Sequence, residues 1–566
     1  MPKDHVHSTL TLAFALHQKQ QFDEAEKLYG FILKDNPSYT PAQHGLGILL
    51  AQTNRHQKAQ EQLKAVINKE PNNPTFHLSY ANVLLALEDF DQAKHHYKEA
   101  IKIAPTYIQA INNLGNAYFK TGEYMLAKQY YEKAVKHSAL PQYLFNLSNA
   151  HLSLNNAREA IDHLQSITEH PDFILDAKKL MAQAHLKIGL YDQALKWYLR
   201  ALELSPSDAS MHHESGICYL QLKDYTKAIE AFLKTIDLEP EHTEAYYHLA
   251  NTYLAVGKVK QAKSFYLNQI TYSKMIECYF NVGVLLEKEG RHQEAITFFT
   301  SCLEINPDYI PAHQNIASSY LQANRIDQAI KHYEILHNLD ENNSEYNHIL
   351  SALKQTHTPE KTPDQYIQNL FDHYAPHYNA HMQNFLDYQV PQKILDLLES
   401  HHLSGKPLNQ IIDLGCGSGL CGHVLHPHTH TLIGIDLSEK MLEQARKTGF
   451  YNELICDNIE TRLGKILPSD GLVASDVLSY LGDLNQLFEG VFKALKPSGF
   501  FCFTIEKTHQ YPYVLQKSIR YAHHKSYIHE QAQIHGLEIV SYENIQLRKH
   551  HQSHIEGYLF LLKKPS

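Results

Sequence analysis

Two neighbouring segments combine glycines with a carboxylate in a way that suits a nucleoside ligand. Residues 411–419 read Ile-Ile-Asp-Leu-Gly-Cys-Gly-Ser-Gly, an apolar strand that ends in Asp413 and breaks into alternating glycines. Glycines at such a turn let the backbone bend tightly and let a ligand approach with no Cβ in the way. Residues 434–437 form a second apolar strand that ends in Asp436, and a carboxylate there is the expected partner of a ribose diol. The pair predicts a nucleoside-cofactor site, and the N–H groups at the start of a helix expected over 419–425 are further donors for the ligand.

Strands and helices alternate from residue 409 onward, which predicts a doubly wound parallel sheet. The strands expected in that sheet are 411–414, 432–437, 453–456, 471–474 and 500–505, with helices at 419–425, 439–447 and 483–495 between them. The last two strands, 537–547 and 555–562, have a turn and no helix between them, so we expect them to pair antiparallel.

This layout resembles class I S-adenosylmethionine-dependent methyltransferases, whose sheet ends in such a hairpin and whose first motif matches residues 413–419. The resemblance implies S-adenosyl-L-methionine as cofactor, with Asp413 orienting the methionyl ammonium, Asp436 holding the ribose hydroxyls and Leu437 packing on the adenine. Together with the lid residue introduced below, the cofactor-binding residues it implies are Asp413, Gly415, Cys416, Gly417, Gly419, Asp436, Leu437, Asp457, Asn458, Ser475 and Tyr378.

A dinucleotide site is the main alternative, because residues 417–422 also fit G-x-G-x-x-G, which is a weak fingerprint by itself. Asp413 argues against it: a carboxylate there would face a pyrophosphate, whereas it suits a cationic ammonium and sulfonium. The terminal hairpin also disfavours a dinucleotide fold.

Methyl transfer to an acceptor depends chiefly on positioning, and on a general base where the acceptor carries a proton at neutral pH. No residue is singled out by spacing as that base, so the catalytic residue stays open. Residues expected near the acceptor are Tyr374, Asp476, Glu506, Arg520 and His523. Residues 520–523 are expected on a helix that follows the fifth strand.

The segment before the first strand admits two interpretations. A polar stretch with two prolines predicts a linker at 355–363, followed by the α/β domain at 364–566. Tyr374 and Tyr378 are four residues apart, so they share one helix face. This helix either packs on the sheet or closes as a lid with both tyrosines inward, and its resemblance to the corresponding segment of many small-molecule methyltransferases favours the lid.

A string of the form Asp/Gln-x-Ala-x-x-x-aromatic recurs every 33 or 34 residues through the first part of the chain. Its alanines are Ala25, Ala59, Ala93, Ala127, Ala160, Ala194, Ala228, Ala262, Ala295 and Ala329. Small residues let two antiparallel helices cross closely, and the aromatic fills the gap to the next unit. The pattern resembles the tetratricopeptide repeat: ten units over 6–343, and a capping helix at 344–354 that completes a repeat domain at 6–354. The predicted fold is therefore an all-α tetratricopeptide-repeat superhelix followed by an α/β Rossmann-like class I methyltransferase domain.

Amides recur at one place in the first helix of several repeats, which predicts a ladder along the concave groove. The members are Asn82, Asn116, Asn149, Gln183 and Asn251. Such a ladder hydrogen-bonds the backbone of an extended peptide; the alternative is that amides are simply tolerated at half-exposed positions.

Composition limits the other partners. A formal net charge of −10 gives no footprint for nucleic-acid binding, and no apolar run is long enough to span a membrane. Seven cysteines without a C-x-x-C pair predict reduced thiols and a cytoplasmic protein. Four histidines between residues 423 and 430 fall at the sheet end opposite the glycines, so we expect no metal site.

Three functions follow from this organisation. The first is a methyltransferase whose repeats recruit a protein acceptor, and the second is a small-molecule methyltransferase with the repeats as scaffold. The third is a non-catalytic scaffold that keeps a sensing cofactor fold, which the intact glycines and both acids disfavour. Strings such as Arg520-Tyr-Ala-His resemble bacterial proteins that join tetratricopeptide repeats to a methyltransferase. The acceptor, the partner in the groove, the oligomeric state and any specialised export stay open.

Overall fold

The computed structural model describes residues 3–384, 386, 388–401, 407–550 and 553–566. The chain divides into two compact units, Met1–Cys278 and Tyr279–Ser566. The expected fold class is confirmed: an all-helical repeat array is followed by an α/β domain with a mostly parallel sheet. The domain boundary expected at 355–363 stays a prediction. The two compact units meet at a different place, between Cys278 and Tyr279.

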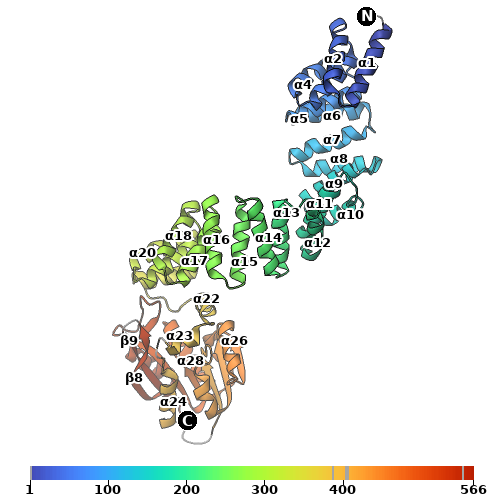
Figure 1. Cartoon of the computed structure of the whole chain (residues 1–566). Coiled ribbons are helices and arrows are strands. Elements are labelled where there is room, and N and C mark those ends of the chain that lie inside the picture. The colour runs from blue at the N-terminus through green and yellow to red at the C-terminus, as the bar shows by residue number, and fades with distance from the viewer. Residues whose placement is uncertain (1–2, 385, 387, 402–406, 551–552) are drawn as a thin grey trace. The chain divides into compact units, whose positions relative to one another are not determined.

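Consecutive helices of the first unit form pairs, shown from blue to green in Figure 1. They are α1 (Lys3–Gln18), α2 (Phe22–Asp35), α3 (Thr40–Gln52), α4 (His56–Lys69), α5 (Pro74–Ala86), α6 (Phe90–Ile103), α7 (Ile108–Lys120), α8 (Tyr124–His137), α9 (Pro141–Ser153), α10 (Ala157–Leu164), α11 (Ile174–Lys187), α12 (Tyr191–Leu202), α13 (Ala209–Gln221), α14 (Tyr225–Leu238), α15 (Thr243–Ala255) and α16 (Val259–Tyr272). Local chemistry sets several starts: the side chains of Asp89 and Asp224 cap α6 and α14, and proline occupies the first turn of α5 and α9.

The recurring aromatic packs over a glycine of a first helix. A Cβ on Gly115 would lie 2.6 Å from the ring of Tyr131, and one on Gly216 would lie 2.6 Å from Phe232. Each of these rings therefore covers the glycine of its own pair. Phe232 also stacks on His248 of α15, and Tyr29 covers Gly45 of the next pair, so the expected contact with the neighbouring unit is present at these two rings.

The second unit joins the last repeat helices to the α/β domain. The division falls within α17 (Ile276–Lys288), and the remaining helices of the array are α18 (His292–Ile305), α19 (Ile310–Gln322), α20 (Ile326–Leu339) and α21 (Ser344–Lys354). Helix α21 has the bounds expected of the capping helix. Its Ala352 packs against Leu515 and Tyr521 of the α/β domain, so the cap shares a core with that domain.

The expected linker makes ordered contacts with the α/β domain. The carbonyl of Glu360 accepts hydrogen bonds from the backbone N–H groups of Gly482 and Asp483, each at 2.8 Å, and Thr362 donates its N–H to the carbonyl of Tyr480 at 3.1 Å. These bonds join the chain after α21 to a wall of the site described below.

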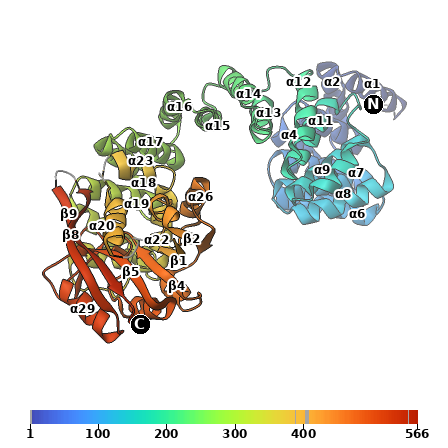
Figure 2. The same cartoon turned by 90° about the horizontal axis from the view of Figure 1, so that it is seen from below.

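The sheet has the strand order β3-β2-β1-β4-β5-β7-β6, and β9 pairs with both β5 and β8. Its strands are β1 (Leu408–Leu414), β2 (Thr429–Asp436), β3 (Glu453–Cys456), β4 (Ser469–Ala474), β5 (Leu495–Lys507), β6 (Tyr513–Leu515), β7 (Tyr521–His523), β8 (Glu538–His550) and β9 (Ser553–Lys563). Strands β1 to β5 pair parallel, with a register shift between Ser469 and Gly471 of β4, and the antiparallel pairing of β8 with β9 is confirmed. Figure 2 shows β1, β4 and β5 next to one another.

Helices cover both faces of this sheet. They are α22 (Asp364–Tyr374), α23 (Tyr378–Asn384), α24 (Val390–His401), α25 (Gly422–Leu425), α26 (Glu439–Thr448), α27 (Ile459–Leu463), α28 (Asn485–Ala494) and α29 (Lys525–Ile534), with short 3₁₀ turns at His426–His428 and Leu478–Tyr480. Apolar side chains of α24 and α25 form one core with the sheet, and those of α27, α28 and α29 form the other.

Two expected elements are wrong. Residues 520–523 do not form a helix, because Tyr521–His523 is a strand that pairs parallel with Glu506 and Lys507 of β5. The pairing of β4 with β5 ends at Phe503, so the following part of the same β5 edge is open to β7. The helix expected over 419–425 is reduced to Gly422–Leu425, since tight turns occupy the residues before it.

Candidate functional site

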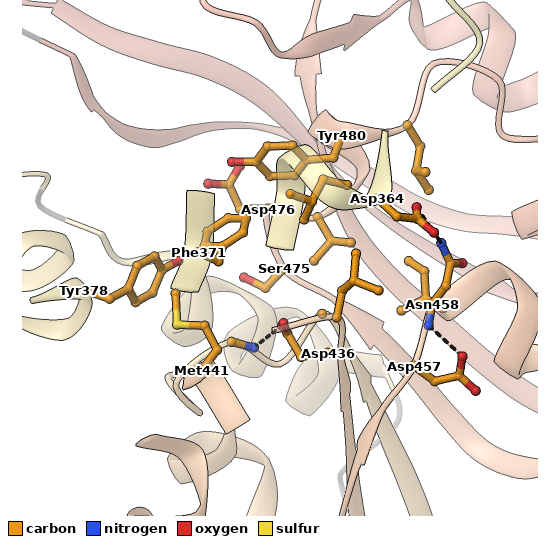
Figure 3. Close-up of a pocket in the computed structure, with 17 residues that line it drawn as sticks. Asp364, Phe371, Tyr378, Asp436, Met441, Asp457, Asn458, Ser475, Asp476 and Tyr480 are labelled. Carbon is orange, nitrogen blue, oxygen red and sulfur yellow. Dashed lines mark hydrogen bonds between the residues drawn. The ribbon is translucent and has the colours of Figure 1, made fainter. Parts of the chain in front are cut away.

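A cavity opens where the carboxyl ends of β1, β2, β3 and β4 meet, at the reversal of strand order between β1 and β4 (Figure 3). Open α/β sheets bind ligands at this place. The lining residues from these strand ends are Gly415, Gly417, Asp436, Leu437, Asp457, Asn458, Ser475 and Asp476. The structure therefore brings together most of the residues that the sequence singled out.

Asp436 ties the glycine turn to the second strand. Its carboxylate accepts the backbone N–H of Gly417 at 2.8 Å and that of Ser438 at 2.9 Å (Figure 3 shows the first). Burial raises the pKa of Asp436, while these backbone donors act in the opposite direction. Each carboxylate oxygen still has a lone pair for a ligand hydroxyl.

Gly415 is required by close packing as well as by backbone conformation. It adopts a φ of +66°, and a Cβ built on it would lie 2.1 Å from a methyl group of Val477. Its N–H and that of Cys416 donate to the carbonyl of Ile435 at 2.7 and 3.0 Å. These two N–H groups therefore hold the turn against β2.

Asp413 lies beside the cavity and does not line it. Its side chain is 1% exposed and accepts the hydroxyl of Tyr451 at 2.7 Å. Burial raises the pKa of Asp413 to about 7, with the charge of Asp436 acting in the same direction. The ring of Tyr451 packs against Gly419, Gly422 and Gly434. Cys416 and Gly419 are likewise outside the cavity lining, so their contact with a ligand stays a prediction.

The segment before the first strand forms a lid over part of the cavity. Asp364, Ile367 and Phe371 of α22 and Tyr378 of α23 line the cavity. Asp364 accepts the side-chain amide of Asn458 at 3.0 Å. Two further bonds fasten the lid: Asp372 accepts the hydroxyl of Ser438, and Asn379 accepts that of Ser418.

The two tyrosines of the lid have different roles. Tyr378 lines the cavity, as expected, and burial raises its pKa well above the ordinary value. Tyr374 does not line it; its ring packs edge-on against Tyr378 at 5.2 Å. The expectation that both tyrosines point inward is therefore wrong for Tyr374, because the helix ends at that residue and a new one starts at Tyr378.

Four charged side chains form a cluster around Asp476, beside the cavity. Arg548 donates to both oxygens of Asp476, at 2.6 and 2.7 Å, and also to Glu506. Arg520 reaches Asp476 at 3.5 Å. Of these four, only Asp476 lines the cavity, and its φ of +59° is rare for a residue other than glycine. Glu506 is buried behind Arg548, so its expected contact with the acceptor is indirect.

His523 is placed away from the cavity. It is fully buried, its Nε2 bonds the carbonyl of Gly482 at 3.0 Å, and its ring stacks on Tyr527. Burial lowers its pKa to about 4, so the imidazole is neutral at pH 7. The expected role at the acceptor is wrong, because the backbone of β7 turns this side chain into the core.

Some residues of the site were not expected from the sequence. Phe371, Asp364, Met441 and Tyr480 line the cavity, and Tyr451 holds Asp413. The aromatic run before the first strand is a signal that could have found Phe371, whereas nothing in the local sequence distinguishes Tyr451 from an ordinary loop residue.

The amide ladder has a structural role in the first unit. The hydroxyls of Tyr97 and Tyr131 donate to the side-chain oxygens of Asn82 and Asn116, at 2.7 and 2.8 Å, and Tyr266 bonds Asn251 in the same way. Asn149 and Gln183 have no such tyrosine bond. Three surface hollows follow one another along these amides, lined in turn by Asn82 with Asn116, Asn116 with Asn149, and Asn149 with Gln183. The amides thus brace buried tyrosines and also line a groove.

Family models match both parts of the chain. A model described as "Methyltransferase domain" matches residues 412–501. Repeat models match most of the array: "Tetratricopeptide repeat" at 10–83, 286–353 and 108–138, "TPR repeat" at 81–122, and "Anaphase-promoting complex, cyclosome, subunit 3" at 187–269. The chain combines tetratricopeptide repeats with a methyltransferase domain. The resemblance read from the two motifs is therefore confirmed at this level.

Similar proteins resemble one part of the chain or the other. Mitochondrial ubiquinone biosynthesis O-methyltransferase of Bos taurus is 34% identical over 148 residues, which is 24% of this chain and 39% of that protein. Protein O-mannosyl-transferase TMTC3 of Mus musculus is 31% identical over 248 residues, 40% of this chain and 27% of that protein. The chain thus spans well under half the length of these relatives. The solved structure of YrrB, described as a TPR protein with an unusual peptide-binding site, is 23% identical with a TM-score of 0.30 and covers 32% of this chain and 95% of its own.

In the part of the chain that the structure describes, no helix is both long and apolar enough to cross a bilayer. The same residues contain no group of three or more His, Cys, Asp or Glu that could hold a metal ion.

Proposed function

We propose that residues 364–566 form an S-adenosyl-L-methionine-dependent methyltransferase and that the repeats recruit a protein or peptide partner. The observation that carries the first part is the charge of the cavity. Its described lining contains four carboxylates, from Asp364, Asp436, Asp457 and Asp476, and no Lys, Arg or His. A dinucleotide would bring a pyrophosphate against these acids, whereas an ammonium and a sulfonium are attracted to them.

The donor set of the cavity fits the proposed cofactor. Asp436 would accept the ribose hydroxyls, and Leu437, Ile459 and Asn458 would surround the adenine. Asp413, held by Tyr451, would favour the ammonium through its negative charge. When bound, the cofactor supplies a methyl group already activated by a positively charged sulfur, so the protein's task is to position the acceptor and exclude water. Tyr378 and Phe371 of the lid would do the latter.

An oxygen acceptor is consistent with the relatives named as O-methyltransferases. Because the matched region covers a minor part of each relative, their substrates do not transfer to this chain. These relatives therefore leave the acceptor of this chain open.

Calorimetry on the full chain tests the cofactor. We expect S-adenosylmethionine and S-adenosylhomocysteine to bind and NAD not to. Asp436→Ala should weaken binding by about 1–3 kcal/mol, the penalty for leaving buried hydroxyls unpaired. The matched control is Asp396→Ala, on an exposed position of α24. Equal affinities of the wild type and Asp436→Ala would remove Asp436 from the site, and binding of NAD alone would refute the proposal.

Recruitment by the repeats is supported by the continuous row of amides in the first unit. Side-chain amides of this kind bind peptide backbone with little sequence preference. Asn149 and Gln183 are the positions to change, because removing them leaves the tyrosine bonds of the other members intact.

We expect the double variant Asn149→Ala, Gln183→Ala to reduce methyl labelling of protein bands when the full chain is added to a lysate with labelled cofactor. The control Asn268→Ala changes an exposed amide of α16 outside these hollows. Labelling that is the same in all three proteins would show that these amides do not recruit the acceptor.

A further inference from the structure

Arg548 and Arg520 both contact Asp476 at the cavity, and they differ in how closely other side chains hold them. The side chain of Arg548 is 6% exposed and is held by both Asp476 and Glu506. The side chain of Arg520 is 25% exposed, and its ion pair among the described residues is a long one, at 3.5 Å, to Asp476. Because Arg548 already compensates Asp476, most of the five donors of Arg520 are available to a ligand.

Arg520 is also held in a defined orientation beside the cavity. Its guanidinium carbon lies 5.1 Å from the centre of the Tyr480 ring, and Tyr480 lines the cavity. The positive charge of Arg520 also acts to lower the pKa of Tyr378 of the lid, against the larger effect of burial. A planar guanidinium stacked on an aromatic ring presents its fork with little loss of freedom, which suits bidentate binding of a carboxylate.

Every carboxylate in the described lining of the cavity already accepts a hydrogen bond. Asp476 is bound by Arg548, and Asp436 accepts two backbone N–H groups. Asp364 and Asp457 accept hydrogen bonds from Asn458. No histidine or lysine is among the lining residues. An acceptor that must lose a proton would therefore find only carboxylates that already accept hydrogen bonds, which weakens them as bases, whereas a carboxylate acceptor is already ionised at neutral pH.

We propose that Arg520 anchors an anionic acceptor and that the methyl group is transferred to a carboxylate oxygen, which gives a methyl ester. A lone pair of that oxygen forms the new bond to the methyl carbon as the carbon–sulfur bond breaks. The electron pair of the broken bond stays on sulfur, and no proton moves. This inference rests on the proposed methyltransferase function and assigns its acceptor class.

Benzoate binding to the full chain, saturated with S-adenosylhomocysteine, tests the anchor by calorimetry. We expect saturable binding to the wild type and a loss of about tenfold or more in Arg520→Gln, the effect of one charge-assisted hydrogen bond. The matched control is Arg200→Gln, which removes another arginine stacked on an aromatic ring, 4.8 Å from Trp197. If Arg520→Gln does not fold, Arg520→Lys keeps the charge without the fork and should bind more weakly than the wild type. Equal binding by wild type and the Arg520 variant, or no saturable binding at all, overturns the proposal.

The bond formed is tested by alkali. Label transferred from methyl-labelled cofactor in a lysate should be released as volatile methanol by mild base, since a methyl ester hydrolyses and methyl ethers or methylamines do not. Label that resists alkali, or no label, overturns the carboxylate acceptor. Calorimetry separates the two levels: a protein that binds the cofactor and gives base-stable label contradicts only this inference, and one that binds no cofactor contradicts the proposed function.

Discussion

The buried carboxyl of Asp413 makes the stability of the α/β domain depend on pH in a predictable direction. Burial raises its pKa from 3.8 to about 7 in the folded protein. The unfolded chain ionises this group from about pH 4 upward, while the folded protein keeps it protonated until about pH 7. Its stabilising contribution is therefore complete below about pH 4, decreases as pH rises and is lost above about pH 7.

The substitution that isolates this effect is Asp413→Asn, which keeps the shape of the side chain and cannot titrate. One pH unit corresponds to about 1.4 kcal/mol, so the full interval is worth about 4 kcal/mol. The free energy of unfolding of the wild type, relative to that of Asp413→Asn, should fall by about 2–3 kcal/mol between about pH 5 and pH 7. The constant cost of burying an unpaired amide in the variant cancels from this slope.

Hydrogen exchange measured by mass spectrometry is the suitable assay. The single tryptophan, Trp197, lies in α12 of the other compact unit, so its fluorescence reports on the repeats. Peptides from β1 and β2 report on the core around Asp413. The ratio of wild-type to variant protection factors should fall about tenfold per pH unit. A ratio that stays constant between about pH 5 and pH 7 would refute the reasoning. Saturating S-adenosylmethionine should flatten the slope, because a nearby cation favours the ionised carboxyl.

Two further matched pairs test packing and hydrogen bonding. Gly415→Ala and Gly417→Ala both place alanine at positive φ. Only the first adds a clash, with Val477, since nothing lies within 4 Å of a Cβ at Gly417. A urea titration should therefore show that Gly415→Ala loses more stability than Gly417→Ala, by about 1–3 kcal/mol, the range for overpacking. Tyr97→Phe removes the hydroxyl bond to Asn82 and should destabilise the repeats by about 1 kcal/mol. Tyr198→Phe removes a buried hydroxyl without a partner among the described residues and should be neutral or stabilising. Equal effects within either pair would contradict the assigned contacts.

Periodicity and composition were sufficient for the repeats. The phase of Ala25, Ala59 and the later alanines predicted paired helices because each small residue marks a helix crossing, and that requirement is local to one unit. The end of the array was predicted for the same reason, since α21 must cover the last apolar face. The role of the amides was predicted only in part, because the hydroxyl that Asn82 accepts belongs to Tyr97, a residue on the facing helix.

Most of the cavity followed from local motifs. A strand that ends in Gly415 and Gly417, followed by a strand that ends in Asp436, places these residues at one edge of a parallel sheet regardless of the rest of the chain. The acceptor side was less predictable. Residues 520–523 have no local feature of a strand, and they form β7 because β5 is longer than β4 and leaves an edge to pair with.

The sequence by itself determined the two architectures and the place of the cavity, because helix crossings, strand ends and glycine turns are specified by residues close together in the chain. Only the tertiary structure decided which charges meet: it joined Arg548 and Arg520 to Asp476, turned His523 into the core, and placed Tyr451 on Asp413. Such contacts depend on the distances between elements far apart in the sequence, and burial then sets the protonation and the donors that the site has to offer.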